Sequence, residues 1–135
     1  MSNKQNEQFN YDRFTSEFLP FSGEEFKCAS YIWVEGCLDR IILSFENESL
    51  VIEAESEFDT VSLSRIPNSE MAQEADAIPA EGVWSKYIGQ KFSWGWVTIN
   101  QQNYLDGIML SFTNIVPDLL LNVAASSIYV YEISK

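Results

Sequence analysis

A group of carboxylates between residues 46 and 59 is the first feature of this sequence that could do chemistry. Carboxylates can act as general acids and bases, bind Mg²⁺ or Ca²⁺, or attract a basic partner. On a strand, the alternating glutamates at 53, 55 and 57 would stand about 7 Å apart, without a glycine turn to wrap a cation. We therefore expect no catalysis or metal binding here, and interpret the group as a solvated strand face or as a surface for a basic protein. Its members are Glu46, Glu48, Glu53, Glu55, Glu57 and Asp59.

A second group combines aromatic rings with side-chain amides over residues 94–106. Four consecutive amides, at 100–103, stand between an aromatic strand and a tyrosine. One interpretation is a hairpin turn, with Trp94 and Trp96 sharing one strand face in the core. The other is a small-molecule or glycan site, in which rings stack and amides give directional hydrogen bonds. The residues of this alternative ligand site are Trp94, Trp96, Asn100, Gln102, Tyr104 and Asp106.

The composition excludes several classes of function. The 135 residues contain no histidine, which removes Ser-His-Asp and Cys-His nucleophile systems and any histidine-ligated metal. Glycine-rich phosphate loops and G-x-S-x-G are absent, so we expect neither an enzyme nor a cofactor. With 20 acidic against 8 basic side chains, the net charge is −12, which disfavours nucleic acid and anionic membranes as partners.

The negative charge is confined to one part of the chain. Residues 1–81 carry 17 acidic and 5 basic side chains, whereas residues 82–135 carry 3 of each. The excess therefore belongs to the first part, including the carboxylate group, and the second part is neutral. An acidic face of this kind favours a basic protein partner and steers its approach at low salt.

An internal repeat organises the chain. Residues 38–47 (LDRIILSFEN) and 105–114 (LDGIMLSFTN) are identical at seven of ten positions, at an offset of 67. Upstream, the glycine and phenylalanine of 23–26 match those of 89–92 at an offset of 66. We predict one domain over residues 1–135, with repeat copies at 20–66 and 86–135 and a linker at 67–85.

Each copy predicts the same elements. A short aromatic segment with helical spacing precedes a glycine, and four short segments rich in β-branched and aromatic residues follow it. The predicted strands are 26–35, 38–45, 50–56 and 60–66 in copy one, and 92–100, 105–112, 119–125 and 127–133 in copy two. A four-stranded meander alone would expose an apolar face and two edges. The predicted fold is therefore mainly β (with α+β as an alternative): two antiparallel meanders packed as a pseudo-twofold sandwich or barrel-like sheet.

The repeat also predicts which side chains are structural. The alternation at 41, 43 and 45, and again at 108, 110 and 112, places Phe45 and Phe112 in the core, near each other across the pseudo-axis. Asp39 and Asp106 occupy equivalent places, so we expect both to satisfy backbone of an adjacent turn.

Cysteine usage and the amino terminus indicate the compartment. Cys28 and Cys37 have neither metal-site nor redox spacing, and we interpret them as two reduced, partly buried thiols, with a disulfide as the alternative if their strands face each other. The first ten residues lack the apolar core of a signal peptide, and no apolar run reaches the roughly 20 residues of a membrane helix. These features predict a cytoplasmic location.

The segment from Trp84 to Phe112 carries W-x-x-x-I-G, W-x-W, N-Q-x-x-Y-L-D-G and L-x-F. In these motifs it resembles a family of small acidic bacterial proteins classed as a domain of unknown function. The resemblance covers most of the chain and is strongest over residues 88–112. It implies a bacterial, cytoplasmic, single-domain protein and brings no activity to any residue.

Together these features predict a non-enzymatic protein that acts through protein contacts, as a monomer or homodimer. Our leading hypothesis is an inhibitor-like protein, of the kind that gives immunity by blocking a basic toxin or nuclease with the acidic face of the first copy. The alternative is a small-molecule or glycan-binding domain at residues 94–106.

Overall fold

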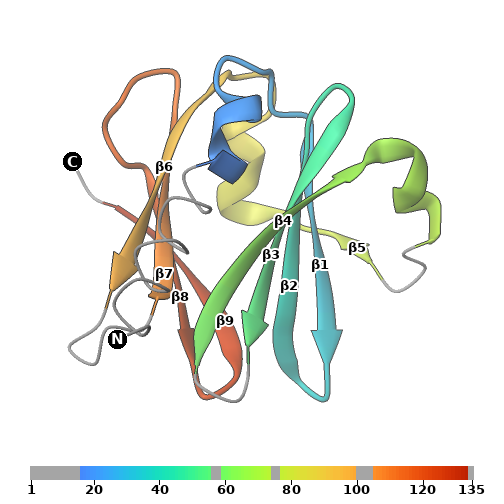
Figure 1. The fold of residues 1–135 in the computed structure, drawn as a ribbon, viewed down its shortest axis with the longest axis vertical. Helices are drawn as coiled ribbons and strands as arrows, with labels where there is room; N and C mark the ends of the chain where they lie inside the picture. Colours follow the sequence, from blue (N-terminus) through green and yellow to red (C-terminus); the bar gives the residue numbers. More distant parts are fainter. Residues whose placement is uncertain (1–15, 56–58, 74–76, 100–104, 134–135) are drawn as a thin grey trace, which may run out of the picture.

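Two antiparallel sheets pack face to face in the computed structural model of the chain, which describes residues 16–55, 59–73, 77–99 and 105–133. The first sheet has the strand order β4-β3-β2-β1-β5, and the second has the order β6-β7-β8-β9 (Figure 1). The strands are β1 Cys28–Val34, β2 Cys37–Ser44, β3 Glu48–Glu55, β4 Thr60–Pro67, β5 Ile78–Pro79, β6 Phe92–Ile99, β7 Leu105–Phe112, β8 Leu119–Ala124 and β9 Ser127–Glu132. This arrangement confirms the mainly β sandwich, and each half of the chain forms a four-stranded meander in the predicted order.

Three short 3₁₀ helices connect or precede the strands. They are η1 Leu19–Phe21, η2 Asn68–Gln73 and η3 Gly82–Tyr87. A glycine with positive φ follows both η1 and η3, at Gly23 (85°) and Gly89 (90°), as the sequence predicts for the end of a helical turn. The predicted linker contains η2 and also β5, a strand that the sequence analysis did not predict, because Pro79 limits it to two residues.

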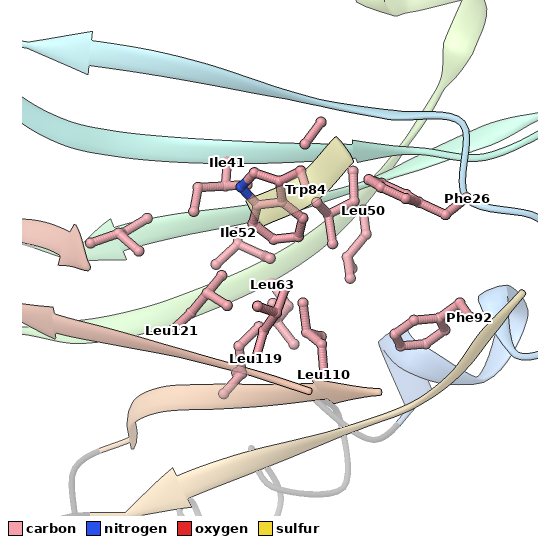
Figure 2. Packing of buried hydrophobic residues seen from close by; sticks show 14 of the residues in the cluster. Phe26, Ile41, Leu50, Ile52, Leu63, Trp84, Phe92, Leu110, Leu119 and Leu121 are labelled. Atoms are coloured by element: carbon pink, nitrogen blue, oxygen red, sulfur yellow. The ribbon is translucent and has the colours of Figure 1, made fainter. Parts of the chain in front are cut away.

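Alternation along the central strands decides which side chains fill the space between the sheets. Ile41, Leu43 and their counterparts Ile108 and Leu110 are fully buried and belong to one core cluster, as predicted. Figure 2 shows residues of this cluster from both layers, with Ile52 of β3 near Leu121 of β8. Burial of such side chains, at roughly 25 cal/mol per Å² of apolar surface, is the main source of stability in this fold.

Two equivalent segments, residues 23–26 and 89–92, pair with each other and join the two halves. Four backbone hydrogen bonds, each 2.8 Å long, connect them: Gly23 N to Phe92 O, Gly89 N to Phe26 O, Phe26 N to Gln90 O, and Phe92 N to Glu24 O. Exchanging each residue with the one 66 positions away turns the first bond into the second and the third into the fourth. The contact therefore has the form of a twofold axis between the halves.

The aromatic rings of the core follow the same relation. The ring centroids of Phe21 and Phe45 are 4.7 Å apart. Tyr87 lies 66 residues after Phe21, and its ring centroid is likewise 4.7 Å from that of Phe112. Phe45 and Phe112 are both buried, which confirms their predicted place in the core. The two rings have a common neighbour, Phe26, whose ring centroid is 6.0 Å from that of Phe45 and 5.3 Å from that of Phe112.

The two sheets are not stacked strand on strand. β2 packs over β9, and β4 packs over β7. The first sheet therefore continues past β9 as β1 and β5, and the second continues past β4 as β6 (Figure 1). Short helices cover parts of these extensions: η3 packs on β1 and η1 packs on β6. The consequence is that inward-facing residues at the outer strands are not all covered by the opposite sheet.

Three sequence expectations need correction. Cys28 is exposed rather than partly buried, and both cysteines are free thiols. They lie at opposite ends of the β1–β2 hairpin, since Cys28 pairs with Ser44 and Cys37 pairs with Val34, so their strands face each other without bringing the sulfurs within reach of a disulfide. Trp94 and Trp96 share a strand face, as predicted, but neither is buried in the core: Trp96 lies on the outward face, and Trp94 is partly buried and packs against the core cluster beside Phe18.

Candidate functional site

Strand β3 directs two of the predicted carboxylates outward. Its burial alternates, with Leu50, Ile52 and Ala54 turned into the core and the intervening residues turned away. Glu53 and Glu55 therefore lie on the outward face of the first sheet, as the E-x-E spacing predicts. Glu57 lies outside the described residues.

Basic residues from neighbouring elements contact this acidic group in space, although none lies within it in the sequence. Within the described residues, each of three cations contacts two carboxylates. The contacts are Lys27 with Glu25 (3.4 Å) and Glu46 (3.4 Å), Arg40 with Asp39 (3.3 Å) and Glu53 (3.9 Å), and Arg65 with Glu17 (3.0 Å) and Glu48 (3.8 Å). The hydrogen bonds that Lys27 donates to Glu25, and then to Glu46, raise the pKa of its ammonium above the ordinary value, so the group stays charged at neutral pH.

The five described carboxylates of the group do not form one patch. Glu46 and Glu48 stand at the start of β3, and Glu55 ends it seven residues later, a separation of roughly 23 Å at 3.3 Å per residue. Asp59 accepts a hydrogen bond of 2.9 Å from the backbone N–H of Ser126, in the β8–β9 turn. Asp59 therefore has a structural role, because this hydrogen bond connects the first half of the chain to the second. The outward acidic surface is therefore centred on Glu53 and Glu55.

The alternative ligand site is only partly described. Trp96 lies on the outward face of the second sheet, opposite Met109 of β7. The ring of Trp94 lies 6.4 Å from that of Phe18 and packs against the core. Asn100, Gln102 and Tyr104 lie outside the described residues.

Asp39 and Asp106 occupy the same structural position in the two halves. Each is the extra residue of a β-bulge, because Ile32 pairs with Arg40 while Trp33 pairs with Leu38, and the β6–β7 register shifts in the same way around Asp106. Their carboxylates bind side chains: Asp39 contacts Arg40, and Asp106 accepts a hydrogen bond of 2.9 Å from the Thr98 hydroxyl. Both aspartates therefore have a structural role. Their partners are side chains, whereas the sequence predicts backbone groups of the adjacent turn.

A further surface, which the sequence analysis missed, lies on the extension of the first sheet past β9. Tyr31 and Trp33 alternate with the core residue Ala29 and therefore face inward, yet Trp33 is 49% exposed. Ile78 of β5 pairs with Tyr31 and is 50% exposed. The phenol of Tyr31 accepts a hydrogen bond of 2.6 Å from Nε1 of the buried Trp84. Alternation alone could not reveal this surface, since it depends on how far the two sheets are offset.

Two kinds of feature are absent from the described ranges. No group of three or more cysteine, aspartate and glutamate side chains is placed to hold a metal ion. No helix in these parts of the chain is long and apolar enough to cross a membrane.

Fold and surfaces together define a two-sheet β-sandwich built from two meanders, with Glu53 and Glu55 on the outward face of the first sheet. Residues 16–135 match the model of a family of unknown function, DUF6334, and the chain belongs to this family. No curated protein and no solved structure matches the chain.

Proposed function

We propose that this protein is a non-enzymatic interaction protein, of the inhibitor or immunity type, that binds a basic partner through the outward acidic face of its first sheet. The observation that carries the proposal is the outward placement of Glu53 and Glu55 on β3, beside a single described arginine, Arg40, whose guanidinium contacts both Asp39 and Glu53. Both carboxylates point away from the core, where the side chains of an external cationic partner can reach them.

The rest of the charge distribution supports the same face. The second half of the chain carries no net charge, which leaves a dipolar molecule with one acidic layer. Glu55 is exposed at the end of β3, and Glu53 is 43% exposed in its side chain. A basic partner would approach this layer first, and its lysines or arginines would compete with Arg40 for Glu53.

The test is affinity capture from extracts of cells that express the protein, with purified captured protein then titrated by calorimetry. We expect a basic partner whose dissociation constant rises steeply with salt over about 0.05–0.5 M. The double variant Glu53→Lys/Glu55→Lys should weaken binding at least about tenfold, mainly through a slower association rate.

A matched control reverses charge elsewhere. Glu81→Lys changes an exposed acidic residue near η3, outside the first sheet, and should change the affinity less than about twofold. Binding that is insensitive to the β3 double variant, or a captured partner that is acidic, would contradict the proposal.

A small-molecule or glycan site on the second sheet is the second candidate function. It rests on the outward placement of Trp96 in a row with Met109, Leu120 and Tyr131, a row without charge on which a neutral sugar could stack. Tryptophan fluorescence titrated with cellohexaose, chitohexaose and maltohexaose tests it. A response that survives Trp96→Ala would exclude this surface.

A further inference from the structure

The equivalence of the two halves extends upstream of their pairing segments, into the helical turns that precede them. Residues 16–21 are helical, and so are residues 82–87, at an offset of 66. The ring centroids of Phe26 and Trp84 are 6.1 Å apart. Those of Phe92 and Phe18, the residues at the equivalent positions, are 6.3 Å apart. The pseudo-twofold relation therefore holds back to residue 16 in one half and residue 82 in the other.

In the first half, the segment before this helical turn pairs with the outer edge of β1. β5 provides the pairing, with Pro79 opposite Ser30. Next to this pair, the N–H of Ala80 donates a hydrogen bond of 2.9 Å to the carbonyl oxygen of Ala29, which is buried. The first sheet thus gains its fifth strand from the residues that lead into η3 (Figure 1).

The outer edge of β6 is the equivalent edge in the second sheet. The Ser111 hydroxyl contacts both the backbone N–H and the carbonyl oxygen of Trp94, at 3.2 and 3.3 Å, so Trp94 turns its backbone groups toward β7. The register is regular over residues 94–98, so Gly95 and Val97 turn their backbone groups the other way, toward the edge. No strand in the described part of the chain pairs with this edge.

The burial of Gly95 indicates that this edge has an occupant. Gly95 is buried, as its equivalent Ala29 is. β5 lies beside Ala29, whereas no described strand lies beside Gly95. The ring of Phe18 packs on Gly95, but a ring cannot donate the hydrogen bond that the carbonyl group of a buried residue needs. An N–H group from an added segment would supply it.

We propose that the chain's own residues 12–14 add to the outer edge of β6, as β5 adds to β1. They lie outside the described residues, and the offset of 66 relates them to residues 78–80. By the same offset, Arg13 lies opposite Trp96, and the N–H of Phe14 donates to the carbonyl oxygen of Gly95. The second sheet then has a fifth strand, which covers an edge that would otherwise present unpaired backbone groups.

The residue types suit the positions that the offset gives them. Phe14 takes the place of Ala80, which packs against the core. Arg13 and Trp96 form a non-hydrogen-bonded pair on the outward face, where paired side chains lie closest and a guanidinium can stack on an indole ring. Residue 12 is an aspartate in the place of an isoleucine that is half exposed, so its carboxylate keeps contact with water.

Nuclear magnetic resonance of the full chain tests the proposal. In a non-hydrogen-bonded antiparallel pair the two Hα atoms face each other, so we expect a strong nuclear Overhauser effect between Hα of Arg13 and Hα of Trp96. The edge-facing amide of Val97 should exchange with solvent at least about a hundredfold more slowly than an unprotected amide. Absence of the effect, or free exchange at Val97, would overturn the proposal and leave the edge open to a partner protein.

A mixture of isotope-labelled and unlabelled chains distinguishes a segment of the same chain from that of a second copy. The effect between Arg13 and Trp96 is expected within one chain, so it should be missing from a spectrum filtered for contacts between labelled and unlabelled chains. An effect that persists in this spectrum would show that copies exchange the segment, which would contradict the proposal.

Proline variants separate this edge from the rest of the fold. Phe14→Pro removes the proposed donor and should speed exchange at Val97 at least about tenfold. Gln8→Pro, in the same segment but outside the pairing, should change this rate less than about twofold. Ala80→Pro removes the equivalent donor at β5 and should speed exchange at Tyr31 while Val97 stays protected. Equal effects of Phe14→Pro and Gln8→Pro on Val97 would exclude the proposed register.

This edge is independent of the acidic face. Glu53→Lys/Glu55→Lys should leave the exchange rate at Val97 unchanged, so the failure of one proposal does not count against the other. A rate that rises in this double variant as much as in Phe14→Pro would show that Val97 reports on the whole fold and would overturn its use as evidence for the added strand.

Discussion

The indole N–H of Trp84 donates a hydrogen bond of 2.6 Å to the phenol oxygen of Tyr31, across the boundary between the core and the exposed extension of the first sheet. Trp84 is fully buried, and Tyr31 is half-buried with Trp33 beside it at a ring distance of 6.2 Å. One polar contact thus satisfies the only side-chain donor of a buried tryptophan and fixes the orientation of a ring on the exposed extension of the first sheet.

Tyr31 should make folding stability depend on pH in the alkaline range. Burial raises the pKa of its phenol above the ordinary 10.0, and the bond from Trp84 lowers it in part. Because the unfolded phenol ionises first, the contribution of Tyr31 is complete below about pH 10 and is lost as pH rises toward the folded pKa. Urea unfolding at about pH 9 and about pH 11 should show a smaller loss in Tyr31→Phe than in the wild type.

Trp84→Phe is a second variant for the same comparison of urea unfolding at the two pH values. It removes the donor that favours the phenolate, so the alkaline loss should become larger than in the wild type. Identical pH dependence in the wild type and Tyr31→Phe would show that Tyr31 ionises alike in both states.

Phe45→Ala and Phe112→Ala should each lower the free energy of unfolding by about 3–5 kcal/mol, as truncation of a buried aromatic residue does. Both rings contact Phe26 and Phe92, at centroid distances from 5.3 to 6.0 Å. The double variant should therefore lose less than the sum of the single ones. Thermal melts of the three variants check this, and neutral single variants would refute the equivalent-core arrangement.

Gly95→Ala should destabilise the fold by about 1–3 kcal/mol. An added Cβ at this position would lie 2.4 Å from Cε1 of Phe18, a ring that is itself buried. Phe18→Leu, which removes the clashing edge, should recover part of the loss when combined with it. Ser93→Ala, a half-buried neighbour on the same strand, is the control that should stay near the wild-type denaturation midpoint.

Unlike Gly95, the β8–β9 turn is a place where substitution should raise the stability of the fold. Its two central residues, Ala125 (φ 51°) and Ser126 (φ 66°), both have positive φ without being glycine. The double variant Ala125→Asn/Ser126→Gly should therefore stabilise the protein by about 1 kcal/mol. The β1–β2 hairpin has a two-residue turn with the same signs of φ, at Glu35 (φ 51°) and Gly36 (φ 81°), and Gly36→Ala should destabilise by a similar amount. Unfolding by guanidinium measures both, and a loss of stability in the double variant would contradict the turn assignment.

Much of the fold follows from local rules, which is why the sequence predicts it. Strand positions and the inward set at Ile41, Leu43 and Phe45 depend on a period of two, and Gly23 and Gly89 mark the ends of helical turns. The offset between the sheets depends on how side-chain volumes fit across the core, and no local pattern encodes it. That offset is what leaves Trp33 exposed although it alternates as a core residue.

The candidate site divides in the same way. The outward direction of Glu53 and Glu55 follows from alternation along one strand. The pairing of Glu53 with Arg40 depends on the register between β2 and β3, and the hydrogen bond from Ser126 to Asp59 links residues 67 positions apart. Such contacts are set by tertiary packing, so a charge count along the chain overstates how free the carboxylates are.

The pairing of residues 23–26 with 89–92 has the exchange relation of a homodimer interface, but both sides belong to one chain. An interface between separate chains weakens on dilution, whereas this contact is held at a fixed effective concentration by the peptide linking its two sides. The stability of the sandwich should therefore be independent of protein concentration. The two meanders stay together at copy numbers at which a dimer of separate halves would dissociate.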